Sequence, residues 1–166
     1  MPWNRTKFLR EVDRSRLTKG AREAADQRPE LAYRNLLDLI RAGTSSERQL
    51  INSLWLLHHL FVRRGVAIDF DGVVDAVRSV LVNAQSFAVR DAAARVLLTH
   101  CMYGVVSPGL AFSTCRAREL AHVIVREQPS LVAVAKYVLE LCDRRESRLG
   151  SAFSSQGPVG GASEEI

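Results

Sequence analysis

The sequence lacks the features that mark a membrane-spanning or a secreted protein. No apolar run approaches the roughly 18 residues that a membrane helix needs, and the longest, Leu54–Val62, contains two histidines. The N-terminal residues lead directly into charged side chains, without the apolar stretch of a secretory signal. The three cysteines (Cys101, Cys115 and Cys142) are odd in number and irregularly spaced, which fits a reducing compartment. We therefore expect an intracellular protein, cytoplasmic or nuclear, with no membrane contact.

Strand patterns are also scarce, and helical patterns fill most of the chain. Only Val66–Ile68 hints at a strand, and three residues do not make a sheet. Elsewhere apolar residues recur at intervals of three and four, which is typical of amphipathic helices. The length of 166 residues suits one domain. We predict a single all-α domain over residues 1–148, with a basic helix at about residues 5–19. A disordered Gly/Ser-rich tail is expected over residues 149–166.

Capping residues predict several helix boundaries. Thr44 followed three residues later by Glu47 matches a capping box at the start of the most apolar helix. Gly65 then predicts the end of that helix, and Gly104 the end of a helix over residues 87–103.

Three apolar helices align at a spacing of about 40 residues. Leu54 matches Ala93 at an offset of 39, Ala135 follows after a further 42, and Gly65 matches Gly104. Each of these helices follows another amphipathic helix, so the sequence predicts three helical hairpins. Residues 88–97 resemble the second helix of a HEAT unit, where a Val-Arg pair precedes small and then larger apolar residues. This resemblance implies a short HEAT/armadillo-like solenoid of stacked hairpins; a compact multi-helix bundle is the alternative.

One segment resembles a catalytic motif. Val66–Val74 is similar to the first motif of haloacid-dehalogenase-type phosphatases, in which a buried strand ends at Asp-x-Asp. By that resemblance Asp69 would attack phosphorus, Asp71 would act as the general acid/base, and both would hold magnesium. That motif needs a central parallel strand, whereas helical patterns surround this segment. In the competing interpretation, one of the two aspartates caps the helix over residues 72–83.

Other sets of catalytic or metal-binding residues are missing from the sequence. It contains no nucleophile elbow, phosphate loop, dinucleotide fingerprint or zinc-protease motif. His58 and His59 are adjacent, so on a helix they point about 100° apart and cannot easily share a metal ion. His100 is expected near a helix end, where free carbonyls are available, and the cysteines as small buried side chains. We predict a non-catalytic protein with no cofactor and no metal site.

Positive charge is concentrated near the N-terminus. The net charge is +5, and residues 1–28 hold eight Lys/Arg against four acids. Such a cluster is typical of phosphate binding, and Trp3 is available to stack on a base. The candidate nucleic-acid-binding residues are Arg5, Arg10, Arg14, Arg16 and Lys19. The alternative is the solvated charged face of a packed helix.

Grooves between packed helices favour protein binding as the function. Such grooves accept amphipathic helices or extended peptides, and Trp3, Trp55 and Tyr103 are candidate exposed aromatic contacts. We predict a non-catalytic protein–protein interaction module or adaptor. Its partner is a helix or peptide of another protein, or a second copy that makes an oligomer. Nucleic-acid binding through the N-terminal region is the alternative, followed by a magnesium-dependent phosphatase on Asp69 and Asp71.

Overall fold

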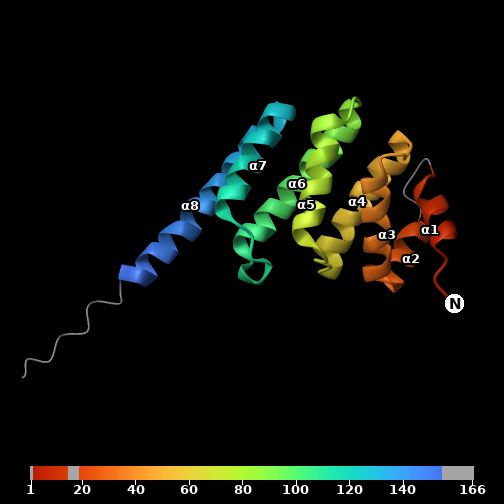
Figure 1. Cartoon of the computed structure of the whole chain (residues 1–166), viewed down its shortest axis with the longest axis horizontal. Coiled ribbons are helices and arrows are strands. Elements are labelled where there is room, and N and C mark those ends of the chain that lie inside the picture. Colours follow the sequence, from red (N-terminus) through yellow and green to blue (C-terminus); the bar gives the residue numbers. More distant parts are fainter. Residues whose placement is uncertain (1, 15–18, 155–166) are drawn as a thin grey trace, which may run out of the picture.

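The computed structural model describes residues 2–14 and 19–154, and regular structure in this part of the chain is entirely helical (Figure 1). No strand occurs among the described residues, which confirms the all-α prediction. The α-helices are α1 (Arg5–Val12), α2 (Lys19–Gln27), α3 (Pro29–Ala42), α4 (Glu47–Arg64), α5 (Phe70–Asn83), α6 (Phe87–Val106), α7 (Thr114–Glu127) and α8 (Val132–Ser154). Two 3₁₀ turns lie between α-helices: η1 (Pro108–Leu110) precedes α7, and η2 (Pro129–Leu131) precedes α8.

Helices α3 to α8 form three hairpins that lie side by side in chain order (Figure 1). The second helices of the hairpins, α4, α6 and α8, pack against one another in one layer, which we call the second-helix layer. The first helices, α3, α5 and α7, make the other layer, the first-helix layer. At the N-terminal end, α1 and α2 pack against the first hairpin. This packing agrees with the predicted arrangement of stacked or bundled hairpins.

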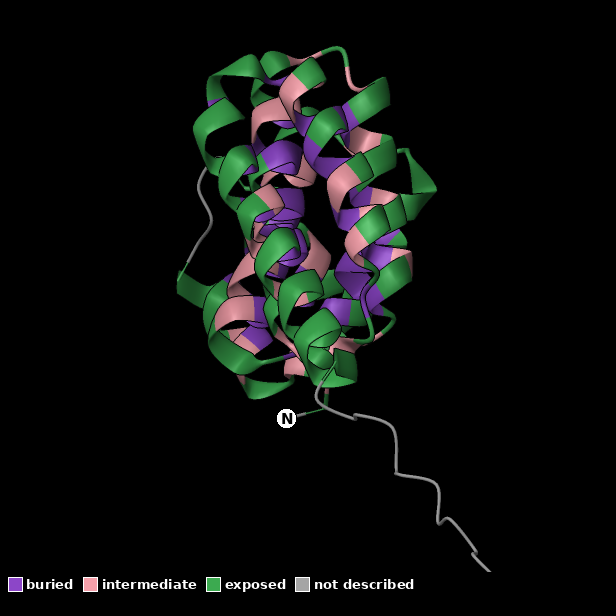
Figure 2. Ribbon diagram, turned by 90° about the vertical axis from the view of Figure 1, so that its left-hand side faces the viewer, coloured by how far each residue is buried: buried purple, intermediate pink, exposed green. Residues whose placement is uncertain are grey.

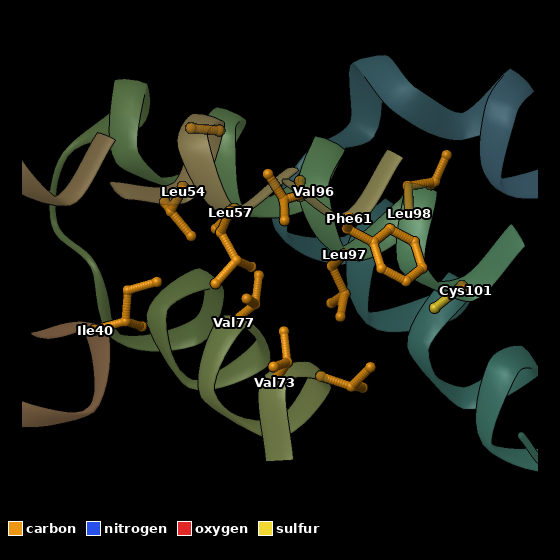
Figure 3. Packing of buried hydrophobic residues seen from close by; sticks show 14 of the residues in the cluster. Ile40, Leu54, Leu57, Phe61, Val73, Val77, Val96, Leu97, Leu98 and Cys101 are labelled. Carbon is orange, nitrogen blue, oxygen red and sulfur yellow. The ribbon is translucent and has the colours of Figure 1, made fainter. Parts of the chain in front are cut away.

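The hydrophobic core lies between the two layers, where buried residues line the inner sides of the helices (Figure 2). The side chains that meet there recur every three or four residues, so each helix buries one stripe. Full burial of such a side chain contributes about 1.5–3 kcal/mol relative to exposure. Figure 3 shows this packing, which includes Leu54, Leu57, Val73, Val77, Val96 and Leu97.

Helix α6 occupies the centre of the molecule and contacts four other long helices, α4, α5, α7 and α8. It is therefore buried on several sides, and its N-terminal half contains three consecutive buried alanines, Ala92, Ala93 and Ala94. A methyl side chain lets neighbouring helices approach closely, because larger side chains would hold their axes apart. The central position of α6 thus explains why this stretch is both apolar and small.

Two predicted helix boundaries differ from those in the structure. The N-cap of α4 is Ser46, whose hydroxyl accepts a hydrogen bond from the Gln49 amide, so the prediction of Thr44 as the cap was wrong by two residues. Gly65 ends α4 in the left-handed conformation, as predicted. Gly104, in contrast, is a buried residue inside α6, which continues to Val106.

The predicted ends of the domain also shift. Helix α1 ends at Val12 rather than continuing to residue 19, and residues 15–18 lie outside the described residues. Helix α8 continues to Ser154, six residues past the predicted boundary. Leu149 and Phe153 follow the buried Cys142 by seven and eleven residues, so they extend the apolar stripe of this helix. The predicted disorder of residues 155–166 falls outside the described part.

Within the described ranges, no helix combines the length and the apolar character that crossing a membrane requires.

Candidate interaction surface

The basic residues predicted to bind nucleic acid do not form one free cationic surface. Arg5, Arg14 and Lys19 each lie 3.1–3.9 Å from a carboxylate oxygen of a neighbouring acid. Arg10 is exposed and forms no ion pair with any residue that the structure describes, and it lines a shallow pocket together with Arg5. Arg16 lies outside the described residues. The acids next to these side chains reduce the positive potential that the sequence suggested.

Trp3 is part of the packing of the N-terminal end. Its indole nitrogen donates a hydrogen bond to the Asn35 side chain of α3 at 3.0 Å. Its ring packs against Phe8, with the ring centroids 4.8 Å apart. Trp3 is therefore half-buried and engaged with the fold, and does not stand free to stack on a base.

The two aspartates of the phosphatase-like segment have structural partners. Residues 66–69 form the link between α4 and α5, so Asp69 does not follow a strand. Asp69 is the N-cap of α5 and accepts a hydrogen bond from the Gly72 amide, which confirms the capping interpretation. A hydrogen bond from Arg41, 2.8 Å away, holds the pKa of Asp69 below its usual value. Asp71 pairs with Arg116 of α7 at 2.7 Å.

The histidines and cysteines form no metal-binding group. Among residues 2–14 and 19–154, no cluster of three or more His, Cys, Asp or Glu side chains is placed to hold a metal ion. Cys101 and Cys142 are buried as predicted, whereas Cys115 is exposed, contrary to the prediction, because it lies on the outer side of α7. Burial raises the pKa of the Cys101 thiol to about 12, so this thiol stays protonated at neutral pH.

His100 lies in the interior of α6 and not near its end, because this helix continues for six more residues. Its Nδ1 donates a hydrogen bond to the Val96 carbonyl at 2.8 Å, and its ring stacks on Phe61. The side chain is only 1% exposed, and burial lowers its pKa to about 4. His100 is therefore a neutral core residue at pH 7.

Each helix of the second-helix layer exposes at least one aromatic side chain, and Phe87 at the start of α6 and Phe153 near the end of α8 are exposed as well. Trp55 of α4 is 36% exposed, Tyr103 of α6 40% and Tyr137 of α8 45%. Trp55 contacts His58 edge-on, and the Tyr103 ring contacts Phe61 of α4, so it spans the junction between α4 and α6. These three aromatic residues define what we call the aromatic face.

In the aromatic face, Trp55 and Tyr137 point away from the core, whereas Tyr103 lies at the junction between α6 and α4. Trp55 and Tyr103 each stand two residues from a fully buried side chain, Leu57 and Cys101 respectively. Two residues correspond to a rotation of about 200° around a helix, which turns the Trp55 ring away from the interior. Tyr103 shares its side of α6 with the buried Val96, seven residues earlier, and is exposed at the junction with α4. Tyr137 precedes a buried cysteine of α8 by five residues, a rotation of about 140°. At the N-terminal end of the layer, α1 and α2 contact α4.

The two layers differ in charge. In the first-helix layer, six Lys/Arg side chains balance six Asp/Glu side chains within the helices. In the second-helix layer, nine Lys/Arg side chains outnumber five Asp/Glu side chains. The nine cations are Arg48, Arg63, Arg64, Arg90, Arg95, Lys136, Arg144, Arg145 and Arg148.

Ion pairs account for much of the charge on the first-helix layer. Arg116 of α7 bridges Asp71 and Asp75 of α5, and Arg78 of α5 reaches Glu119 of α7 at 3.5 Å. These pairs join neighbouring helices and neutralise the surface between them. In the second-helix layer four exposed cations have no ion-pair partner within the described ranges, namely Arg48, Arg63, Lys136 and Arg148.

A groove also separates the first two hairpins. It has a volume of about 360 Å³ and lies between the end of α3, the start of α4 and the end of α5. Ile40, Leu50 and Val80 provide its apolar lining, and Ser79 and Asn83 its polar rim. Its size suits a few side chains of a bound segment, so it is the second candidate surface.

Sequence reasoning identified Trp55 and Tyr103 but missed Tyr137 and the charge of the second-helix layer. The signal for the charge was present in the hairpin pattern. Summing the charges of alternate predicted helices would have separated the two layers, because alternate helices share a layer when hairpins stack side by side.

No protein-family model matches the chain, and no curated protein and no solved structure is significantly similar to it.

Proposed function

We propose that the protein is a non-catalytic interaction module that works inside the cell and binds another protein through the aromatic face. The observation that carries this proposal is the exposure of Trp55, Tyr103 and Tyr137, one on each helix of a single layer. Tryptophan and tyrosine are enriched at the centres of protein interfaces, because they bury a large area while keeping a polar group for hydrogen bonding.

The rigidity of the layer supports this role. The aromatic residues project from three helices that pack directly against one another, so their relative positions are set by the core beneath them. A preorganised surface loses little conformational entropy on binding. The partner that suits it is a helix or an extended segment that crosses α4, α6 and α8.

Affinity capture from a lysate of the source organism tests this proposal. The bait is the full chain, compared with the double variant Trp55→Ala/Tyr137→Ala, and each capture is run with and without nuclease. Val82→Ala is the matched control, because Val82 is a similarly exposed apolar residue (42%) on α5 in the other layer.

The expected result is a protein partner that withstands nuclease, that the Val82→Ala bait retains and that the double variant retains at least tenfold less. Equal recovery on all three baits contradicts the proposal. Loss of all binding after nuclease treatment supports the alternative, nucleic-acid binding through Arg5, Arg10, Arg14, Arg16 and Lys19. A second copy of the chain is also a protein partner in this sense, and sedimentation of the purified chain and its double variant identifies it.

A further inference from the structure

We propose that the partner segment of the aromatic face is acidic at both ends and apolar in its middle. This inference rests on the proposed function and adds the chemistry of the partner. It follows from where the unpaired cations lie relative to the exposed aromatic residues. Unpaired positive charge lies on the two outer helices, α4 and α8, whereas the central helix α6 contributes Tyr103 and no free cation.

The flank on α4 carries Arg48 and Arg63. Arg48 precedes Trp55 by seven residues, which is two helical turns and therefore the same side of α4. Arg63 follows Trp55 by eight residues, a rotation of about 80°, so it lies about 12 Å further along α4 and at the edge of this side. Both arginines are exposed and make no ion pair with the described residues.

The flank on α8 has the same character. Arg148 follows Tyr137 by eleven residues, three turns along the helix and on the same side. Lys136 is next to Tyr137 and is also exposed without an ion pair within the described chain. Arg144, on the same side, lies 3.9 Å from Glu140.

The central helix, α6, contributes no free cation. Arg95 pairs with Asp91 at 2.9 Å, and Arg90 donates hydrogen bonds to the carbonyls of Ala84 and Gln85. A nucleic-acid backbone carries a negative charge at every nucleotide, and proteins bind it along a continuous positively charged groove. Exposed aromatic residues with separate cations beside them are instead typical of a protein interface. The distribution therefore favours an acidic polypeptide over a nucleic acid.

The distance between the flanks sets the spacing of the acids in the partner. Packed helices lie about 8–10 Å apart, so α4 and α8 are separated by about 16–20 Å across α6. A partner helix that crosses the layer spans this distance with about 12 residues. We infer that it carries acidic residues about three turns apart, with leucine or aromatic residues between them.

Selection from a phage-displayed library of random 16-residue peptides tests this chemistry directly. The immobilised full chain is the target, in parallel with three variants whose folding is checked by urea denaturation. One is Arg48→Glu/Arg63→Glu/Arg148→Glu, the second is Trp55→Ala/Tyr137→Ala, and the third is the control Arg34→Glu. Arg34 is an exposed arginine of α3 in the first-helix layer.

The expected result is enrichment of net-negative peptides with an apolar middle. Their binding should fall at least tenfold on the charge-reversed triple variant and on the aromatic double variant, and stay within twofold on the control. Enriched peptides that need the two aromatic residues but carry no excess of acids overturn this inference and leave the proposed function standing. Enrichment that ignores the aromatic substitutions overturns the proposed function as well. Tighter binding of the oligonucleotide dT16, with displacement of the peptides, assigns the face to nucleic acid instead.

Discussion

At the residue scale, buried polar side chains join parts of the fold that are distant in sequence. Asn52 of α4 is almost fully buried, and its amide donates hydrogen bonds to the carbonyls of Val12 and Arg14, both at 2.8 Å. These carbonyls stand at the end of α1, where the helix itself supplies no donor. Asn52 therefore fastens α1 to the first hairpin, although the sequence presents it as one polar residue in an apolar helix.

Replacing Asn52 by leucine should lower the free energy of unfolding by about 1–3 kcal/mol, because buried carbonyls lose their donor. Asn52→Asp should be at least as harmful, since a carboxylate cannot donate to a carbonyl. Urea denaturation measures both changes. An unchanged midpoint for Asn52→Leu would show that the two hydrogen bonds contribute nothing to stability.

His100 makes the stability of the folded chain depend on pH. Its pKa is about 4 in the folded chain, because burial disfavours the imidazolium, and about 6.5 when the chain is unfolded. Between these values only the unfolded state binds a proton, so stability is complete above pH 6.5 and falls as the pH approaches 4. The loss from this group reaches about 3 kcal/mol near pH 4.

The variant His100→Phe should therefore lose stability less steeply than the wild type between pH 7.5 and 4.5, as measured by urea midpoints. Asp26 does not confound this comparison. Hydrogen bonds from Arg64 and His59 lower its pKa to about 2, so its contribution is present above pH 4 and is lost only below that value. Parallel pH profiles for the two proteins would contradict the assignment to His100.

At the element scale, the packing of α6 requires a glycine at one close contact as well as large apolar side chains elsewhere. Gly104 lies where α6 meets the loop before α7, and a Cβ atom there would stand 2.6 Å from Cδ1 of Phe112. Phe112 itself is buried and packs edge-on against Phe70. Its ring has no room to move aside without disturbing this aromatic contact.

Gly104→Ala should thus destabilise the protein by about 1–3 kcal/mol, the usual cost of overpacking a core. Gly150→Ala is the control, because Gly150 is an exposed helical residue of α8 with open space around it. There the alanine should leave stability unchanged or raise it by up to about 1 kcal/mol. Equal thermal midpoints for the wild type and Gly104→Ala would rule out the close packing against Phe112.

Helix boundaries illustrate what the sequence was able to predict at this scale. Gly65 was predicted correctly, because a left-handed glycine after an apolar helix is a local signal. Gly104 lies 39 residues after Gly65 and was predicted to end its helix in the same way. In the structure it lies inside α6, where the absence of a side chain makes room for Phe112. The contact that explains it comes from Phe112, in the loop that follows η1, so no pattern within the helix reveals it. Similarly, Ser46 and Thr44 are equally good caps until the chain path selects one.

At the scale of the whole molecule, the periodicity of apolar residues was enough to predict three hairpins but not their surface. Tyr137 is one of several large apolar side chains along α8, and only the packing of α8 against α6 and α7 distinguishes buried from exposed positions. The N-terminal cluster shows the opposite error. Its excess charge is real, but the fold brings Asp38 of α3 next to Arg5, an acid outside the segment over which the charge was counted.

The two layers of the molecule have different surfaces. The first-helix layer is balanced in charge and cross-linked by ion pairs such as Arg116 with Asp71. The second-helix layer has excess positive charge and at least one exposed aromatic residue on each helix. Exposed aromatic residues and unpaired cations bring no benefit to a surface that contacts only solvent. At an interface, the aromatic residues bury a large area and the cations select a partner of opposite charge.

Hydroxyl-radical footprinting of the chain, alone and with the partner recovered by affinity capture, tests the location of the interface most directly. We predict that Trp55, Tyr103 and Tyr137 are oxidised in the free chain and become protected together in the complex. Val82 on α5 should stay equally reactive in both states. Protection confined to the first-helix layer or to α1, with the three aromatic residues unchanged, would contradict the assignment of the aromatic face as the binding surface.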